Sequence, residues 1–122
     1  MRDFRKLRVW QRAQATCVEV YVFSASLPVD ERFGMTSQLR RAAVSVGANL
    51  AEGSKRTSRV DKARIYNIAQ GEAAEAMSVL DVADRLKYGT PGRAMQLSAV
   101  YEELIGQIER LRQEVLSEVE RR

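Results

Sequence analysis

The side chains of this chain that could do chemistry are carboxylates and arginines at helical spacing. Four polar residues follow one another at steps of four, four and three: Arg41, Ser45, Asn49 and Glu52. In a helix these four share one stripe beside the core. The planar guanidinium of Arg41 can hold a carboxylate by two hydrogen bonds, and we expect it near Glu75. We interpret Arg41, Ser45, Asn49, Glu52 and Glu75 as a structural polar network that fixes the register of the helices.

A catalytic use of Glu52, Glu72 and Glu75 is the enzymatic alternative, and the composition argues against it. The chain contains no histidine, and imidazole-based triads, zinc sites and Glu-x-x-His di-iron sites require one. It also lacks a glycine-rich loop that could cradle phosphates. Cys17 is the only cysteine, which we interpret as a small core residue. We therefore expect no enzyme, no cofactor and no metal site.

Basic residues are concentrated in the first half of the chain. Residues 1–64 hold 13 Lys or Arg against 6 Asp or Glu, whereas residues 65–122 hold 7 against 10. Sixteen of the twenty cations are arginine, which binds phosphate in a bidentate fashion. Two clusters make the excess, and their candidate phosphate-binding residues are Arg2, Arg5, Lys6, Arg8 and Arg12 at the start, then Lys55, Arg56, Arg59 and Lys62.

The elements that must carry these residues are separated by three turn-rich stretches, 28–34, 53–57 and 88–92. Between them, apolar residues recur at alternating steps of three and four, which is typical of helices that pack against other helices. The expected inward stripes are Trp10, Ala13, Cys17, Val20, Ser24 and Leu27; then Met35, Leu39, Ala42, Val46, Asn49 and Gly53. The third segment carries two neighbouring stripes, one of Ile65, Ile68, Val79, Val82 and Leu86 and one of Ala69, Ala73, Ala76, Leu80 and Ala83. The fourth segment carries a single stripe of Leu97, Tyr101, Leu104, Ile108, Leu111 and Val115.

Local signals set the ends of these helices. Pro28 stops the first helix. Ser58 followed by Asp61 resembles a capping box that begins the third. Thr90 and Pro91 read as the N-cap and first turn of the fourth. Four amphipathic helices joined by short loops predict an all-α, antiparallel up-down-up-down four-helix bundle.

Length and composition agree with one domain over residues 1–122. The chain is 45% hydrophobic and 30% charged, the balance of a globular protein. No stretch approaches the roughly 18 to 20 consecutive apolar residues of a membrane span, so we expect a cytoplasmic protein without membrane contact. A domain of this size would gain stability from self-association.

A long run of residues carries a resemblance to one family. These residues are Phe4, Leu7, Val9, Trp10, Leu27, Pro28, Glu31, Phe33, Gly34, Gln38, Leu39, Arg40, Arg41, Ala42, Ala43, Ser45, Ala48, Asn49, Ala51, Glu52, Gly53, Arg56, Ile68, Ala69, Gly71 and Glu75. They cover most of the chain and are most specific between Gln38 and Gly53. The pattern resembles the four-helix-bundle proteins of 23S rRNA intervening sequences. The members of this family are encoded by inserts in bacterial large-subunit rRNA genes or free-standing in genomes, and are often described as ribosomal-protein-like.

The resemblance also implies a ring. Family bundles are similar to the accessory protein of diversity-generating retroelements, a homopentamer that binds a reverse transcriptase and nucleic acid. Two positions depart from the family pattern: Glu72 stands where a small hydroxyl residue is common, and Gly47 where a proline often occurs. Glu72 puts in doubt a close helix contact at Gly71.

Two functions from different classes follow. In the first, the protein is a non-enzymatic, oligomeric accessory protein of nucleic acid or ribonucleoprotein, with a pentamer as the assembly that the resemblance implies. It binds the phosphates of RNA or DNA through its arginine-rich patches. In the alternative, it is a homo-oligomeric protein-interaction scaffold that binds no nucleic acid and whose basic face meets an acidic protein partner.

Overall fold

The computed structural model describes the backbone of residues 3–120 and the side chains of residues 3–117. In that range it contains four long α-helices and two short 3-10 turns, and no strand. The elements are η1 (Phe4–Lys6), α1 (Arg8–Ser24), η2 (Val29–Glu31), α2 (Met35–Lys55), α3 (Arg59–Arg85) and α4 (Arg93–Glu120).

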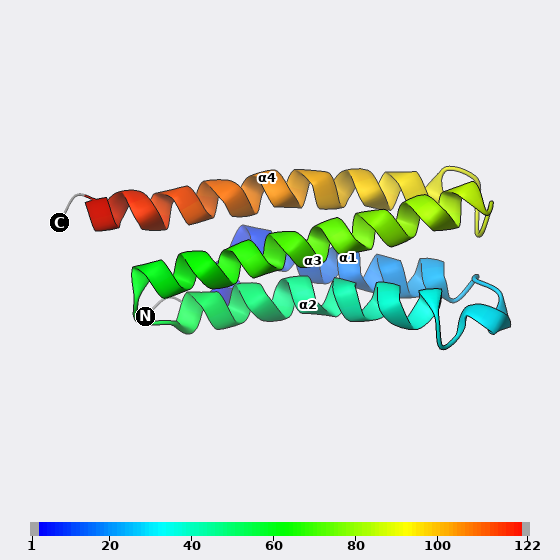
Figure 1. Cartoon of the computed structure of the whole chain (residues 1–122), viewed down its shortest axis with the longest axis horizontal. Helices are drawn as coiled ribbons and strands as arrows, with labels where there is room; N and C mark the ends of the chain where they lie inside the picture. Colours follow the sequence, from blue (N-terminus) through cyan, green and yellow to red (C-terminus); the bar gives the residue numbers. More distant parts are fainter. Residues whose placement is uncertain (1–2, 121–122) are drawn as a thin grey trace.

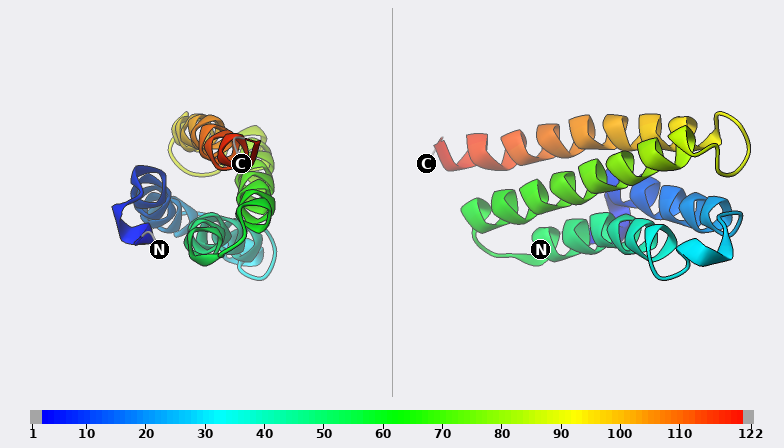
Figure 2. Two further views of the ribbon diagram at one scale, coloured as in Figure 1. Left: turned by 90° about the vertical axis from the view of Figure 1, so that its left-hand side faces the viewer. Right: turned by 45° about the vertical axis from the view of Figure 1, so that its right-hand side comes forward.

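The helices run alternately up and down, side by side (Figure 1). Each helix packs against the next one in the chain, and α4 returns to contact α1. Seen end-on, the helices occupy the four corners of a bundle, with α1 and α3 on one diagonal (Figure 2). The predicted all-α four-helix bundle is confirmed.

The helix ends follow local chemistry, with two differences from the sequence-based expectation. The Ser58 cap is confirmed, because its hydroxyl accepts a hydrogen bond of 3.2 Å from the Asp61 backbone N–H. Helix α1 already ends at Ser24, since the chain tightens into 3-10 bonds before Pro28. Helix α4 begins at Arg93 rather than at Pro91 directly after Thr90, because Gly92 adopts a φ of 83° that interrupts the helical path.

The core contains most members of the predicted inward stripes and several residues that the pattern missed, among them Phe23 and Leu50. Alanines dominate the part contributed by α3, and larger side chains from the other helices fill the space above them. Three residues of the expected α3 stripe, Ile68, Val82 and Leu86, are instead 41 to 50% exposed. These three residues lie at the edge of the apolar face of α3, which is wider than the surface that α2 covers. Tyr66 takes an inward place that the sequence analysis did not assign to it.

Two glycines of α2 allow close approach of neighbouring helices. A Cβ on Gly53 would lie 2.7 Å from the ring of Tyr66 in α3. A Cβ on Gly47 would meet only the end of the Gln14 side chain in α1, which is exposed and can turn aside, so the close approach is tightest at Gly53. Gly71 is different, since a Cβ there would meet no atom within 4 Å. The doubt that Glu72 cast on a close contact at Gly71 was therefore justified.

The expected contact between Arg41 and Glu75 is present, and Glu72 joins it. One nitrogen of Arg41 donates to Glu75 and the other lies 3.1 Å from Glu72. These bonds raise the pKa of the Arg41 guanidinium, with the charge of Glu72 as the largest cause. The side chain of Arg41 is 52% exposed and that of Glu75 34%. The group therefore links α2 to α3 at the surface rather than in the core.

The other members of the proposed polar network do not join Arg41. The Asn49 amide donates to the Ser45 carbonyl 2.8 Å away, a bond within α2. Glu52 pairs with Arg56 one turn further on. These residues therefore do not form the single network that we expected, because Asn49 and Glu52 bond within α2 and its C-terminal cap. Another polar link joins α3 to α4, where Gln70 donates to Glu109 at 2.8 Å.

We predict opposite effects of adding one methyl group at two helical glycines. Gly53→Ala should lower the free energy of unfolding by about 1 to 3 kcal/mol, because the new Cβ collides with a buried ring. Gly71→Ala should raise it by about 0.5 to 1 kcal/mol, because it stiffens an exposed helix position without a clash. Urea unfolding followed by circular dichroism at 222 nm measures both. Equal effects of the two substitutions would refute the close contact between α2 and α3.

A second prediction concerns the surface link between α2 and α3. Arg41→Ala and Glu75→Ala should each destabilise the protein less than Gly53→Ala, because water screens a half-exposed pair. The double variant should lose less free energy of unfolding than the two single variants lose together, since the two residues share one interaction. Strictly additive losses in the same urea titrations would show that the contact contributes nothing.

Candidate nucleic-acid interface

Basic residues from two distant parts of the sequence meet around the ring of Phe4. The guanidinium carbon of Arg5 lies 4.7 Å from the centre of this ring, and the ammonium nitrogen of Lys55 lies 5.9 Å from it. The ring itself packs edge-on against Trp10, with centres 5.1 Å apart. The end of α2 and the start of the chain thus form one surface. We call Phe4, Arg5, Lys6 and Lys55 the basic corner.

Local bonds hold the short η1 turn in place. The carboxylate of Asp3 accepts a hydrogen bond of 3.0 Å from the Arg5 backbone N–H, which is the main cause of its lowered pKa. The Gln11 amide donates to the Arg5 carbonyl at 2.8 Å, and Leu7 is buried behind the turn. The cations of the turn are therefore presented by an ordered backbone, while the side chains of Arg5 and Lys6 are exposed.

Three of the predicted phosphate-binding residues are occupied within the protein. Arg12 pairs with Glu103 of α4. Arg56 bonds to Glu52, which is the main cause of its raised pKa, and lies 3.4 Å from Asp61. The Lys62 ammonium donates to the Ser54 carbonyl at 2.6 Å, so it neutralises the negative end of α2. Their charges stabilise the bundle. In the basic corner Arg5 also lies 3.4 Å from the Asp3 carboxylate, but its side chain is 69% exposed, and Lys6 and Lys55 are exposed as well.

The remaining predicted residues lie in different settings. Arg2 falls outside the described residues. Arg8 is exposed at the first position of α1, and Arg59 is half-buried at the first position of α3. The sequence analysis names the cations and gives Phe4 no role in binding. The position of Phe4 directly beside Arg5 in the sequence is the signal that indicates such a role, because cations pack on aromatic faces.

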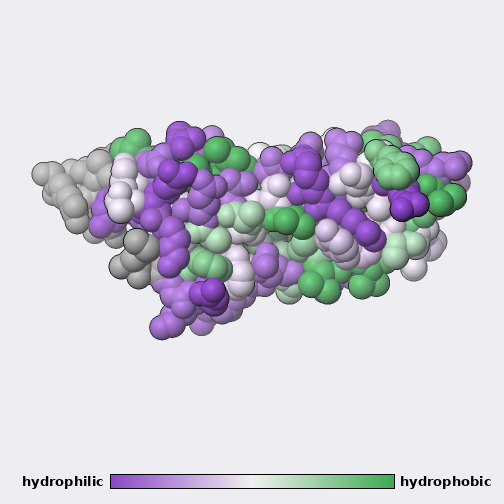
Figure 3. Space-filling view, turned by 90° about the horizontal axis from the view of Figure 1, so that it is seen from below, coloured by the Kyte–Doolittle hydropathy of each residue, from purple (hydrophilic) through white to green (hydrophobic). Residues whose placement is uncertain are grey.

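The face shown in Figure 3 changes in character along the bundle. Hydrophilic side chains gather at the end that carries the termini, and apolar side chains are interspersed with hydrophilic ones toward the other end. Among the described residues, no group of three or more Asp, Glu, Cys or His side chains could hold a metal ion. None of the helices in this range is both long enough and apolar enough to cross a membrane. The basic corner is thus the feature best suited to a polyanion.

Comparison with known proteins agrees with the fold. No curated protein matches the chain. Among solved structures, a protein of unknown function of the S23 ribosomal protein family from Bacteroides thetaiotaomicron is 25% identical, with a TM-score of 0.75. The alignment covers 84% of this chain and 96% of that one. Residues 5–110 match the family model described as 23S rRNA-intervening sequence protein, and the chain belongs to that family.

Proposed function

We propose that the protein is a non-enzymatic, self-associating cytoplasmic accessory protein that binds the phosphate backbone of RNA or DNA through its basic corner. One observation carries the proposal, namely that Phe4 joins Arg5 and Lys55 into one surface although 50 positions separate them in the sequence. Cations from separate elements that converge on one ordered surface can contact successive phosphates of one strand.

The composition of the corner favours backbone contacts over base reading. Both cations pack on Phe4, so the ring is engaged by the protein's own side chains. Arginine and lysine contacts to phosphate carry no sequence information by themselves. The family description names the 23S rRNA intervening sequence, which makes structured RNA the first ligand to test.

Self-association gives this weak contact its strength. One corner offers three exposed cations, and a few phosphate contacts bind weakly at physiological salt. Several copies in one assembly would engage one nucleic acid at once and raise the overall affinity through effective concentration. The ring implied by the family resemblance, with the five copies of the homopentamer that family bundles resemble, is an arrangement of this kind.

The binding prediction compares two triple variants with the same change of charge. Arg5→Gln/Lys6→Gln/Lys55→Gln removes the corner, and the control Arg32→Gln/Arg85→Gln/Lys87→Gln removes three exposed cations at the opposite end. Duplex affinity of the wild type should fall with salt at a log–log slope of about −0.9 per phosphate contacted. The corner variant should flatten this slope by roughly two to three per engaged subunit, while the control keeps it. Fluorescence anisotropy across a salt series measures the slope.

The same titration distinguishes the alternative function. If the corner variant and the control lose affinity for the duplex equally, the net charge rather than the basic corner attracts the nucleic acid. No affinity of the wild type for RNA or DNA at low salt would overturn the proposal and favour a protein-interaction scaffold. Circular dichroism of both variants checks that each is folded.

The self-association prediction is independent of any ligand. Light scattering or sedimentation of the wild type at micromolar concentration should give a mass several times 13.8 kDa. A monomer at every accessible concentration would remove the avidity argument, whatever the affinity of a single corner.

A further inference from the structure

The basic corner already contains an anion of the protein's own. One carboxylate oxygen of Asp3 lies 3.4 Å from a guanidinium nitrogen of Arg5. The same oxygen accepts the hydrogen bond from the Arg5 backbone N–H. Both side chains are open to solvent, Asp3 by 43% and Arg5 by 69%. Among the three cations of the corner, Arg5 is the one that forms an ion pair with a carboxylate of the described residues.

Lys55 acts on the same carboxylate from the end of α2. The Arg5 backbone N–H is the main cause of the lowered pKa of Asp3, and the charges of Arg5 and Lys55 lower this pKa further. Both cations pack on the ring of Phe4. The Asp3 carboxylate therefore lies in the electrostatic field of both cations, as the phosphate of a ligand would.

The two contacts of this oxygen have separate roles. Its hydrogen bond with the backbone N–H caps the η1 turn, and the side-chain oxygen of an asparagine caps a turn equally well. The Gln11 amide holds the same turn independently. The contact with the guanidinium is ionic and requires the negative charge of Asp3. The charge can therefore be removed while the turn is kept.

A phosphate and a carboxylate compete for the same guanidinium. Arginine holds either anion through the same fork of N–H groups. Asp3 is two positions from Arg5, so its carboxylate is present near the guanidinium at a high effective concentration. A phosphate at Arg5 must displace this carboxylate or lie next to it, where the two negative charges repel each other.

We propose that Asp3 limits the affinity of the basic corner for nucleic acid, because its carboxylate pairs with Arg5 until a phosphate takes its place. The inference rests on the proposed function and identifies a residue that opposes it at the same surface. Loss of the Asp3 charge frees Arg5 for the ligand and leaves Lys6 and Lys55 unchanged.

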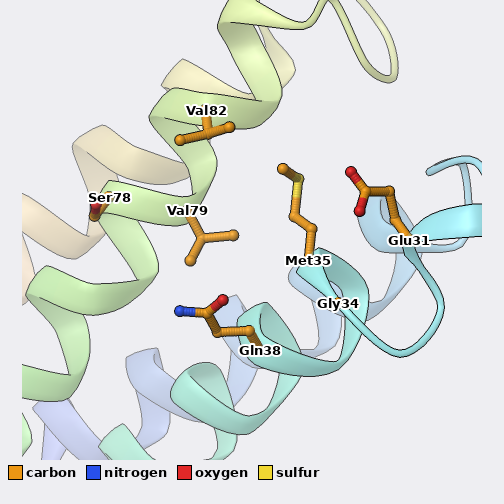
Figure 4. Close-up of a pocket in the computed structure, with 7 residues that line it drawn as sticks. All are labelled: Glu31, Gly34, Met35, Gln38, Ser78, Val79 and Val82. Atoms are coloured by element: carbon orange, nitrogen blue, oxygen red, sulfur yellow. The ribbon is translucent and has the colours of Figure 1, made fainter.

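The test compares Asp3→Asn with the control Asp30→Asn, which makes the same change of side chain and of net charge. Asp30 is exposed in η2, at the opposite end of the bundle (Figure 1). Its neighbour Glu31 borders a hollow of about 330 Å³ between α2 and α3. The residues that line this hollow, Met35 and Val79 among them, include no cation (Figure 4). Removal of the Asp30 charge therefore adds no phosphate contact in this hollow.

Fluorescence anisotropy with one duplex across a salt series measures both variants. At low salt, Asp3→Asn should bind about two- to fivefold more tightly than Asp30→Asn for each engaged corner, which is the effect of one exposed ionic contact. Its log–log slope should be steeper by about 0.9 per engaged corner, because one more cation is available to phosphate. In an Arg5→Gln background the same change at Asp3 should have little effect, since no guanidinium remains for the carboxylate to hold.

Each other result contradicts the inference in a different way. Equal affinities of Asp3→Asn and Asp30→Asn would show that the carboxylate does not compete, while binding by the corner would stand. Weaker binding by Asp3→Asn would mean that Asp3 serves the corner by ordering η1. An undiminished gain in the Arg5→Gln background would mean that Asp3 repels the ligand without pairing with Arg5. If neither the wild type nor Asp3→Asn binds RNA or DNA at low salt, the proposed function fails and this inference with it. Circular dichroism of each variant checks the fold.

Discussion

The bundle depends on close packing against the small residues of α2 and α3. Alanines along the inner face of α3 and Gly53 of α2 let neighbouring backbones approach until large rings and leucines fill the remaining space. Protein cores tolerate neither gaps nor overlap of even one methyl group without cost. Tyr66 of α3 and Tyr101 of α4 are both buried in the space that these small residues leave. The same spacing determines which residues of neighbouring helices come close enough for polar contacts.

The arginines of this chain divide into two groups with different roles. Some satisfy carboxylates or helix ends within the bundle, as Arg12, Arg41 and Arg56 do. Others stand on aromatic rings at the surface, as Arg5 does on Phe4, where its side chain is 69% exposed although it also lies 3.4 Å from the Asp3 carboxylate. A cation on a ring loses little conformational freedom on binding an anion, because its side chain is already oriented. Counting basic residues in a sequence does not separate these groups, and only the second contributes to the proposed binding.

Much of the fold follows from the sequence, because helical periodicity and caps are local. The four helices, the Ser58 cap and the contact of Arg41 with Glu75 were predicted from spacing alone. The start of α4 was not, because the backbone angle of Gly92 outweighs the preference of a Thr-Pro pair. The basic corner could not be predicted either, since it depends on how η1 packs against the end of α2. The same holds for Lys62, whose neighbours are carbonyl oxygens that no sequence pattern reveals.

The order of the helices around the bundle has a consequence for folding. Each helix packs on its neighbour in sequence, so most contacts are local and loop closure costs little entropy. Helices α2, α3 and α4 can assemble as successive hairpins, while α1 must also meet α4 from the far end of the chain. Helix α1 is the shortest of the four and is covered on one side only. It should therefore open before the others and exchange its amide hydrogens fastest, and any partner that covers its outer side would slow that opening.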